Sequence, residues 1–247
     1  MDSAKLREKE FHDKYYSEGG RENAGKFNAI RISSNEYYTR TLMELCPGKK
    51  LLEIGCSEGG ISSRLASLGA EVTGIDISEV AVKNARMRVR EKNLTGIEYQ
   101  VMDAENLEFE EGTFDIIYGG SILHHLDIEK IYKEIARTLK PDGIAIFSEP
   151  LGHNPFINIY RKLTPRMRTA DEHPLLMNDI TIANKFFKLV DVKYFYLFSI
   201  CAAPFHKNIM FKFILGSLEM LDRSAFMLLP FIKKYAWTAI IKFSNPL

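Results

Sequence analysis

The chain has 247 residues, of which 46% are hydrophobic and 26% charged, and this composition is ordinary for a soluble globular protein. A chain of this length can bury a stable core without disulfide or metal staples. The formal net charge is only +1, and the basic residues form no extended track beside a recognisable binding module. The sequence therefore points away from nucleic acid as a partner.

Three further features indicate a reducing, cytoplasmic setting. Cys46, Cys56 and Cys201 form no C-x-x-C pair and no disulfide framework. Residues 1–5 are polar and lack the apolar run of a secretory signal. The most apolar stretch, 209–231, is interrupted by charged residues that are costly in hydrocarbon, so no membrane span is expected.

Two helices are expected before residue 47. The first covers 4–16, and the second begins at Ser33, which lies three residues before Glu36 with the spacing of a capping box. From residue 51 strands and helices alternate, with Ser78 and Asp127 as expected helix caps. Strands are expected near 51–54, 72–75, 97–101, 114–118 and 143–148, and helices near 60–68, 79–92 and 128–139, the last ended by Pro141. This alternation predicts a parallel sheet with right-handed crossovers.

The last third of the chain has a different pattern. A helix at 179–188 and a strand at 190–199 precede a mostly helical segment, 204–235, and a final strand at 237–243. Residues 1–150 carry 20 Lys and Arg against 26 Asp and Glu, whereas residues 151–247 carry 13 against 6. The basic end favours an anionic substrate or membrane surface, or is simply a solvated basic surface.

The most informative motif is Leu51-Leu52-Glu53-Ile54-Gly55-Cys56-Ser57-Glu58-Gly59, a strand followed by a glycine-spaced turn. Such a turn at the carboxyl end of a strand is where open α/β sheets bind nucleotides. A second strand ends at Asp76 and a third at Met102-Asp103-Ala104. Phe114-Asp115-Ile116-Ile117-Tyr118 is followed by Leu123-His124-His125-Leu126, and Leu139-Lys140-Pro141-Asp142-Gly143 leads into a fifth strand.

In this order the motifs resemble those of the class I S-adenosylmethionine-dependent methyltransferases, above all the small-molecule branch that includes the ubiquinone and menaquinone biosynthesis methyltransferases. Ser57 departs from the family pattern, which has a glycine there. The resemblance implies a Rossmann-like, seven-stranded, mostly parallel sheet with an antiparallel last strand. It also implies a single domain over 1–247: N-terminal helices that cover the cleft (1–46), a cofactor-binding core (47–150) and a substrate region with a helical insertion (151–247).

The resemblance further implies S-adenosylmethionine as cofactor and S-adenosylhomocysteine as product. Glu53 and the Gly55 backbone suit the amino-acid end, Asp76 the ribose hydroxyls and Asp103 the adenine. The residues expected to bind the cofactor are Glu53, Gly55, Cys56, Gly59, Asp76, Ile77, Met102, Asp103, Ala104 and Gly119. The acids alone could also be plain capping residues. A dinucleotide is disfavoured because Gly55, Ser57 and Gly60 do not form G-x-G-x-x-G.

Methyl transfer needs alignment and exclusion of water, and a base only for a weak nucleophile. His124 or His125 is the candidate base, with a structural role in the loop as the alternative. Candidate substrate-binding residues are Tyr16, His153, Asn154, Arg161, Arg168 and His173. The arginines could clamp an anion, or be neutralised within the loop by Asp171 and Glu172. No metal is expected, because the polar residues at 153–173 match no ligand signature.

The function expected from the sequence is O- or C-methylation of a small, partly hydrophobic molecule, with a lipidic or isoprenoid substrate as one alternative. The apolar residues of 204–235 are expected mainly in a core or a homodimer interface, with a lipidic substrate pocket or shallow membrane contact as alternatives. The other class of function left open is a catalytically silent methyltransferase-like scaffold that binds a partner through 204–235. Ser57 weakly favours the scaffold, whereas Glu53, Asp76 and Asp103 oppose it.

Overall fold

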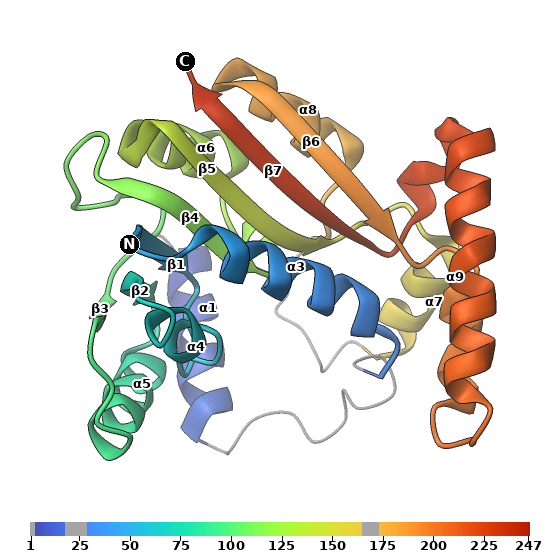
Figure 1. Ribbon diagram of the computed structural model, residues 1–247, viewed down its shortest axis with the longest axis horizontal. Helices are drawn as coiled ribbons and strands as arrows, with labels where there is room; N and C mark the ends of the chain where they lie inside the picture. Colours follow the sequence, from blue (N-terminus) through green and yellow to red (C-terminus); the bar gives the residue numbers. More distant parts are fainter. Residues whose placement is uncertain (1–2, 18–28, 165–172) are drawn as a thin grey trace.

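The protein is built on one seven-stranded sheet with the strand order β3-β2-β1-β4-β5-β7-β6 (Figure 1). The computed structural model describes residues 3–17, 29–164 and 173–247. The strands are β1 (Lys50–Ile54), β2 (Glu71–Asp76), β3 (Ile97–Val101), β4 (Phe114–Gly120), β5 (Leu139–Pro150), β6 (Phe187–Phe195) and β7 (Thr238–Pro246). Only β7 runs antiparallel to its two neighbours, β5 and β6. The predicted mixed sheet with its antiparallel last strand is confirmed.

The parallel part of the sheet brings the carboxyl ends of five strands, β1 to β5, to one edge. β1 lies between β2 and β4, with Ile54 opposite Ile75 and Gly119. β4 in turn pairs with β5, so that Gly120 is opposite Ser148. Strands β2 and β3 are added on one side of β1, whereas β4 and β5 are added on the other side. The point between β1 and β4 is therefore a topological switch point, where open α/β sheets bind ligands.

The helices mostly follow the predicted pattern. They are α1 (Ser3–Ser17), α3 (Ile32–Leu45), α4 (Ser62–Ala66), α5 (Glu79–Glu91), α6 (Ile128–Thr138), α7 (Pro155–Leu163), α8 (Met177–Ile182) and α9 (Phe211–Leu228). Short 3₁₀ turns are η2 (Leu123–His125), η4 (Ala183–Lys185), η5 (Ser199–Phe205) and η6 (Pro230–Tyr235). Ser78 and Asp127 cap α5 and α6 through their side chains, as predicted.

The capping box predicted at Ser33 is wrong. Helix α3 begins at Ile32, and its N-cap, Arg31, makes no side-chain cap bond. The Ser33 hydroxyl instead donates to Glu219 of α9 at 2.8 Å. Ser33 therefore bonds to a residue of a distant helix instead of capping α3, as the local pattern had predicted.

Two predicted boundaries in the second half are also wrong. Helix α6 stops at Thr138 and β5 starts at Leu139, so Pro141 lies inside the strand rather than at a helix stop. The helix expected over 179–188 is shorter, because Phe187 already pairs with Pro246 of β7. In both places the strand begins earlier in the chain than the local sequence pattern predicted.

The two faces of the sheet are covered by different helices. On one face, Tyr38 and Leu42 of α3 and Leu65 of α4 pack against strand residues such as Leu51 and Ile116. On the other face, α6 and α8 cover the larger core, which contains a ring cluster of Tyr132, Phe187 and Phe243. Both faces of the central strands are thus buried, as in other parallel sheets.

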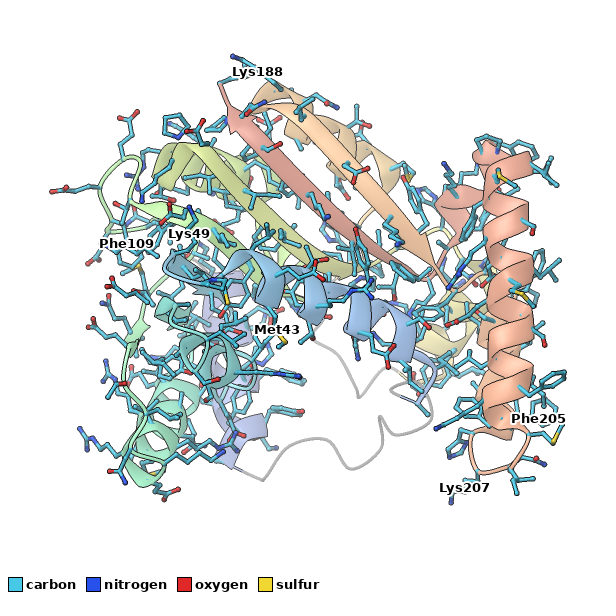
Figure 2. The ribbon with its side chains drawn as sticks, viewed as in Figure 1. Met43, Lys49, Phe109, Lys188, Phe205 and Lys207 are labelled. Carbon is cyan, nitrogen blue, oxygen red and sulfur yellow. The ribbon has the colours of Figure 1, made fainter. Side chains whose placement is uncertain are left out.

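The helical insertion between β6 and β7 consists of η5, α9 and η6. Figure 1 shows α9 at one end of the molecule, far from α5. The prediction that 204–235 is mainly core is wrong for most of its apolar side chains. Those that remain exposed are Phe205, Ile209, Met210, Phe213, Met220, Leu221, Met227, Leu228, Leu229 and Phe231. Figure 2 shows Phe205 and Lys207 projecting outward near the end of this unit.

Helix α9 is nevertheless anchored to the sheet by one buried carboxylate. Asp222 accepts hydrogen bonds from the backbone N–H groups of Leu197, Phe198 and Ser199, and from the Ser199 hydroxyl. Within the part of the chain that the structure describes, no helix is long and apolar enough to cross a membrane.

Candidate active site

A cavity of about 330 Å³ lies at the carboxyl ends of β1, β2 and β4. The turn after β1 contributes Gly55 and Ser57 to its wall, and helix α1 closes one side. Further lining comes from Asp76 and Ile77 after β2, residues 102–105 after β3, residues 120–127 after β4, and His173. The sheet thus brings together the segments in which the sequence predicted cofactor-binding and catalytic residues.

The turn after β1 needs its glycines. Gly55 has φ +70°, and a Cβ there would approach Ile122 to 2.9 Å. Gly59 has φ +76°, and a Cβ there would meet the Tyr99 hydroxyl at 2.2 Å. Ser57, which stands where the family has glycine, also adopts a positive φ of 50°. It is held there by two bonds: its N–H donates to Asp76 at 2.9 Å, and its hydroxyl accepts from Tyr16 at 2.7 Å.

Asp76 is fixed by backbone amides at the end of β2. One carboxylate oxygen accepts from Ser57 N–H and the other from Ser78 N–H, both at 2.9 Å. Burial raises the pKa of Asp76, against the two amide bonds that lower it. An ionised carboxylate has about four acceptor positions, so two are left for hydroxyl groups in the cavity that Asp76 lines.

Glu53 lies beneath the turn rather than in the cavity wall. It is buried and accepts a hydrogen bond from the Ser62 hydroxyl. Burial raises the pKa of Glu53 to about 7, although the Ser62 bond acts in the opposite direction. Three other predicted cofactor residues are also absent from the described lining: Cys56, Gly59 and Gly119.

Those residues support the cavity from behind. Cys56 packs with Val82, Ala85 and Tyr99, and the Gly119 carbonyl accepts from the Tyr38 hydroxyl at 2.9 Å. A Cβ at Gly119 would come within 2.8 Å of the Ile54 carbonyl oxygen. Glycine at this position therefore permits the close approach of β1 and β4.

Ile77, Met102, Asp103 and Ala104 all line the cavity, as the sequence predicted. One Asp103 oxygen accepts from the Glu105 N–H at 2.9 Å, and the other lies 2.6 Å from the Lys5 ammonium. Two apolar side chains beside an anchored carboxylate form a surface suited to a planar heterocycle with an amino group.

Helix α1 covers the cleft, as predicted. Lys5 bridges Asp103 and Glu105, with the second contact at 2.7 Å. At the far end of the helix, Tyr16 donates to Ser57. Between them, Asp13 accepts from Ser78. Burial raises the pKa of Tyr16, so its phenol stays protonated and acts as a donor. The helix is thus bonded to the three loops that follow β1, β2 and β3.

His124, which lines the cavity, forms a buried polar pair with Glu149, which lies behind it. The His124 Nδ1 atom lies 2.7 Å from Glu149 Oε2, and both residues are buried. The other carboxylate oxygen of Glu149 accepts from the backbone N–H groups of Ile122 and Leu123 at 2.8 and 2.9 Å. A carboxylate accepts hydrogen bonds, so Nδ1 is assigned as the donor in this pair.

Glu149 was not among the predicted site residues. Its position in the sequence could have indicated this role. Glu149 lies near the end of β5, which pairs with β4, so it lies at the same edge of the sheet as the histidines that follow β4. His125 was predicted, but its neighbours were not. Its Nδ1 lies 3.2 Å from Glu8 Oε1, and His12 Nε2 lies 3.4 Å from Glu8 Oε2.

The predicted substrate residues are divided by the fold. Tyr16 and His173 line the cavity. Asn154 is buried and caps α7, where it accepts from Phe156 and Ile157 N–H and donates to the Tyr235 carbonyl. His153 accepts from Met177 N–H. Asn154 and His153 therefore hold the loop rather than line the cavity.

The two arginines are not in the described lining either. Arg161 sits in the last turn of α7, and Arg168, with Asp171 and Glu172, lies outside the described residues. The anion clamp therefore stays a prediction.

Comparison with known proteins agrees with this geometry. Residues 52–147 match the family described as a methyltransferase domain. This segment begins in β1 and ends in β5, and it contains the glycine turn, Asp76, Asp103 and both histidines. This part of the chain is therefore similar to a methyltransferase domain, and the resemblance that the order of the motifs indicated is confirmed.

Two of the curated relatives are named as ubiquinone biosynthesis O-methyltransferases. A ubiquinone biosynthesis O-methyltransferase of Idiomarina loihiensis is 36% identical over 125 residues, which are 50% of this chain and 49% of the relative. One from Neisseria meningitidis is 31% identical over 147 residues, 58% of this chain and 59% of the relative. The matched segment thus spans about half the length of these relatives.

The solved structures support the fold over a longer range. Phosphoethanolamine N-methyltransferase 2 of Haemonchus contortus, in complex with S-adenosylhomocysteine, matches with a TM-score of 0.62 at 21% identity, over 87% of this chain and 53% of that one. The [4+2]-cyclase SpnF matches with 0.59 at 21% identity, over 87% and 83%. One of these neighbours is named as a cyclase, so the fold alone does not set the reaction.

Proposed function

We propose that this protein transfers a methyl group from S-adenosylmethionine to a hydroxyl or carbon of a small, partly hydrophobic molecule. The observation that carries the proposal is that one cavity is lined both by the Asp76 carboxylate and by His124, whose ring is paired with the buried Glu149. The first suits a ribose and the second suits removal of a proton. The names of the curated relatives favour a phenolic, quinone-type acceptor.

The cofactor is assigned to the β1–β3 side of the cavity. Asp76 would accept from the two ribose hydroxyls, and Asp103 from the adenine amino group between Ile77 and Met102. The Gly55 turn and Ala104 would offer backbone amides, with Cys56, Gly59 and Gly119 shaping the backbone behind them. Glu53 would act from below the turn on the amino-acid end. S-Adenosylhomocysteine would be the product retained in the same place.

When bound, S-adenosylmethionine supplies a methyl group already activated by its positive sulfur. The residues of this chain then have three tasks: to align the acceptor, to exclude water and to take one proton. His124 is assigned the proton, because Glu149 holds its ring in one orientation and one tautomer. Helix α1 excludes water through its contacts at both ends. Tyr16 and His173 line the acceptor side.

The test is calorimetric titration of the purified chain with S-adenosylmethionine, S-adenosylhomocysteine and NAD. Micromolar binding of the two sulfur compounds and no binding of NAD is the expected result. A methyl-transfer assay on phenols and lipophilic acids would then identify the acceptor. Failure of both sulfur compounds to bind would overturn the proposal. The remaining hypothesis would be a catalytically silent scaffold that binds a partner through 204–235.

We further propose that the outer face of α9 contacts an anionic membrane surface. Phe213, Met220 and Met227 recur every seven residues on the side opposite the buried Leu215 and Asp222, and each is more than 60% exposed. Such a stripe beside cations is typical of a helix that lies on a lipid surface.

The charges around this stripe favour lipid over a second copy of the chain. Lys212, Arg223, Lys233 and Lys234 flank or follow it, whereas Asp222 is buried and Glu219 accepts from Ser33. A second copy would oppose cations to cations, but an anionic leaflet would neutralise them. The free cysteines suit the reducing cytoplasmic side.

Co-sedimentation with vesicles tests this contact. Binding to vesicles that contain phosphatidylglycerol, and loss of binding to pure phosphatidylcholine, is the expected result. A Met220→Ser and Met227→Ser double variant should release the protein without changing its fold. A homodimer in sedimentation analysis that the double variant dissociates, with no vesicle binding, would instead make the stripe a dimer interface.

A further inference from the structure

A cluster of metal-ligating side chains lies where helix α1 meets the loop after β4. Glu8, His12 and His125 each present a ligand atom, and these three atoms lie within 4.8 Å of one another. All three side chains line the cavity. We propose that Glu8, His12 and His125 form a binding site for a divalent cation of the zinc type. The site uses none of the residues assigned above to the cofactor or to proton transfer.

The local structure places the ligands on converging surfaces. Glu8 and His12 are four residues apart on α1, so they share one face of the helix. His125 follows His124, whose ring is fixed by Glu149, so the 3₁₀ turn that carries both histidines is itself held in place. The rings of His12 and His125 meet edge to face, with centroids 5.8 Å apart.

The separations match those of ligands around one ion. Zinc binds histidine nitrogen and carboxylate oxygen at about 2.0–2.2 Å, and simple geometry then separates neighbouring ligand atoms by about 3.0–3.4 Å in octahedral or tetrahedral sites. Glu8 Oε1 lies 3.2 Å from His125 Nδ1, and Glu8 Oε2 lies 3.4 Å from His12 Nε2. These two separations involve different oxygens of Glu8, and the three ligand atoms lie within 4.8 Å of one another, so the two imidazoles must move closer together to share one ion.

The ligand types select the metal. Two imidazoles and one carboxylate suit zinc, cobalt, nickel or iron(II), whereas magnesium and calcium require mainly oxygen ligands. Three protein ligands leave at least one position open, as in zinc sites that hold an exchangeable ligand. Because the three residues border the cavity, that position is available to an oxygen of a molecule bound there.

The electrostatics also favour a cation. Glu8 is a buried carboxylate that lies beside the two imidazoles of His12 and His125. A buried carboxylate next to neutral nitrogen ligands attracts a divalent cation. A divalent ion between Glu8 and the two imidazoles would offset the carboxylate charge and tie α1 to the core. The expectation of no metal considered only residues 153–173, and the fold forms this cluster elsewhere.

The experiment is a titration of the chelator-treated full chain with Zn²⁺ by calorimetry and with Co²⁺ by visible absorption, both without S-adenosylmethionine. The expected result is one equivalent bound with micromolar affinity or tighter, and a visible cobalt spectrum of low coordination number. Because no cofactor is present, the result is independent of whether the proposed methyl transfer is correct.

Variants decide where the ion binds. His12→Ala and the isosteric Glu8→Gln should each weaken Zn²⁺ binding at least about tenfold, because each removes one ligand. Matched controls are His206→Ala, a histidine outside the cavity, and Cys201→Ser, which removes the exposed thiol. Both controls should bind Zn²⁺ like the parent chain.

Circular dichroism in the absence of metal shows that each variant folds, and Zn²⁺ should raise the melting temperature of the parent and of both controls. The inference is overturned if no stoichiometric binding occurs, if His12→Ala and Glu8→Gln both bind like the parent, or if binding is lost in Cys201→Ser.

Discussion

The sheet region (residues 50–150) and the C-terminal region (residues 151–247) use their apolar residues in different ways. In the sheet region Leu52, Ile54 and Ile117 are completely buried between helices on both faces. In the C-terminal region α9 buries one face and exposes Phe213 and Met227 on the other. In the sheet region the apolar residues serve the core, whereas in the C-terminal region they serve both the core, as Phe187 and Phe243 do, and an outward surface on α9.

The polar groups of the two regions differ in the same way. In the sheet region the half-buried carboxylate of Asp76 and the buried carboxylate of Glu149 accept hydrogen bonds from backbone amides; Asp76 lines the cavity and Glu149 supports it. In the C-terminal region Asp222 is buried to attach α9, and Asn154 to start α7. Buried polar groups thus serve the site in the first region and the scaffold in the second.

The largest expected effect is on the rate of methyl transfer. His124→Gln should lower kcat by about 10²–10⁴-fold, because an amide can still bond to Glu149 but is a poor base. Affinity for S-adenosylmethionine, measured by calorimetry, should stay within about twofold. An unchanged kcat with a true substrate would show that the His124–Glu149 pair is structural. The buried polar groups of the two regions would then not differ in role.

The second effect is on stability and tests the scaffold role of Asp222. Asp222→Ala should lower the free energy of unfolding by about 3 kcal/mol, because several buried donors lose their acceptor. Urea unfolding measures this loss, and Asp222→Asn, which keeps one oxygen acceptor, should lose less. Cofactor affinity of the folded variant should not change. A parallel loss of affinity would contradict the separation of the two regions.

The third effect depends on pH and concerns Glu53, whose pKa is about 7 in the folded protein. The native state then holds a proton that the unfolded chain releases near pH 4.5, so the parent loses stability as pH rises from about 4.5 to 7. The loss is at most about 3 kcal/mol, from the size of the shift. Glu53→Gln lacks this loss, so its unfolding free energy relative to the parent should rise between pH 5 and pH 8. Equal slopes would contradict the assignment.

The fourth effect concerns the cofactor. Asp76→Ala should weaken S-adenosylmethionine binding at least about tenfold, or 1.4 kcal/mol, because two hydroxyl acceptors are lost. Calorimetry with S-adenosylhomocysteine gives the same comparison without turnover. Asp115→Ala, at a salt-bridged carboxylate outside the cavity, is the matched control and should bind normally. Normal binding by Asp76→Ala would remove the ribose assignment.

The smallest effect is expected on α9. Met220→Ser should change the free energy of unfolding by less than about 0.5 kcal/mol, because the side chain is exposed. Leu215→Ala, on the buried face of the same helix, should cost about 2–5 kcal/mol. Urea unfolding of the two variants side by side measures the difference. Similar losses in both would mean that the outer face is covered in solution.

The local sequence pattern was sufficient to predict much of the sheet region. The 51–59 turn, the acids at 76 and 103 and the histidines at 124–125 follow strands whose periodicity is plain, and parallel strands must end at a common edge. The sequence therefore determined the fold class and most of the cavity wall. Boundaries such as Leu139 and Phe187 were missed, because Leu139 pairs with Phe114 of β4 and Phe187 pairs with Pro246 of β7, and neither partner is a neighbour in the sequence.

Only the tertiary structure decided which side chains meet. Nothing local joins Glu149 to His124, or Glu8 to His125, which is 117 positions away, because those contacts arise from strand order and from the docking of α1. The same holds for α9, whose composition indicated a core although only one face is covered. Sequence fixes the periodicity of each element, but burial and partnership depend on what packs against it, and that is a property of the whole fold.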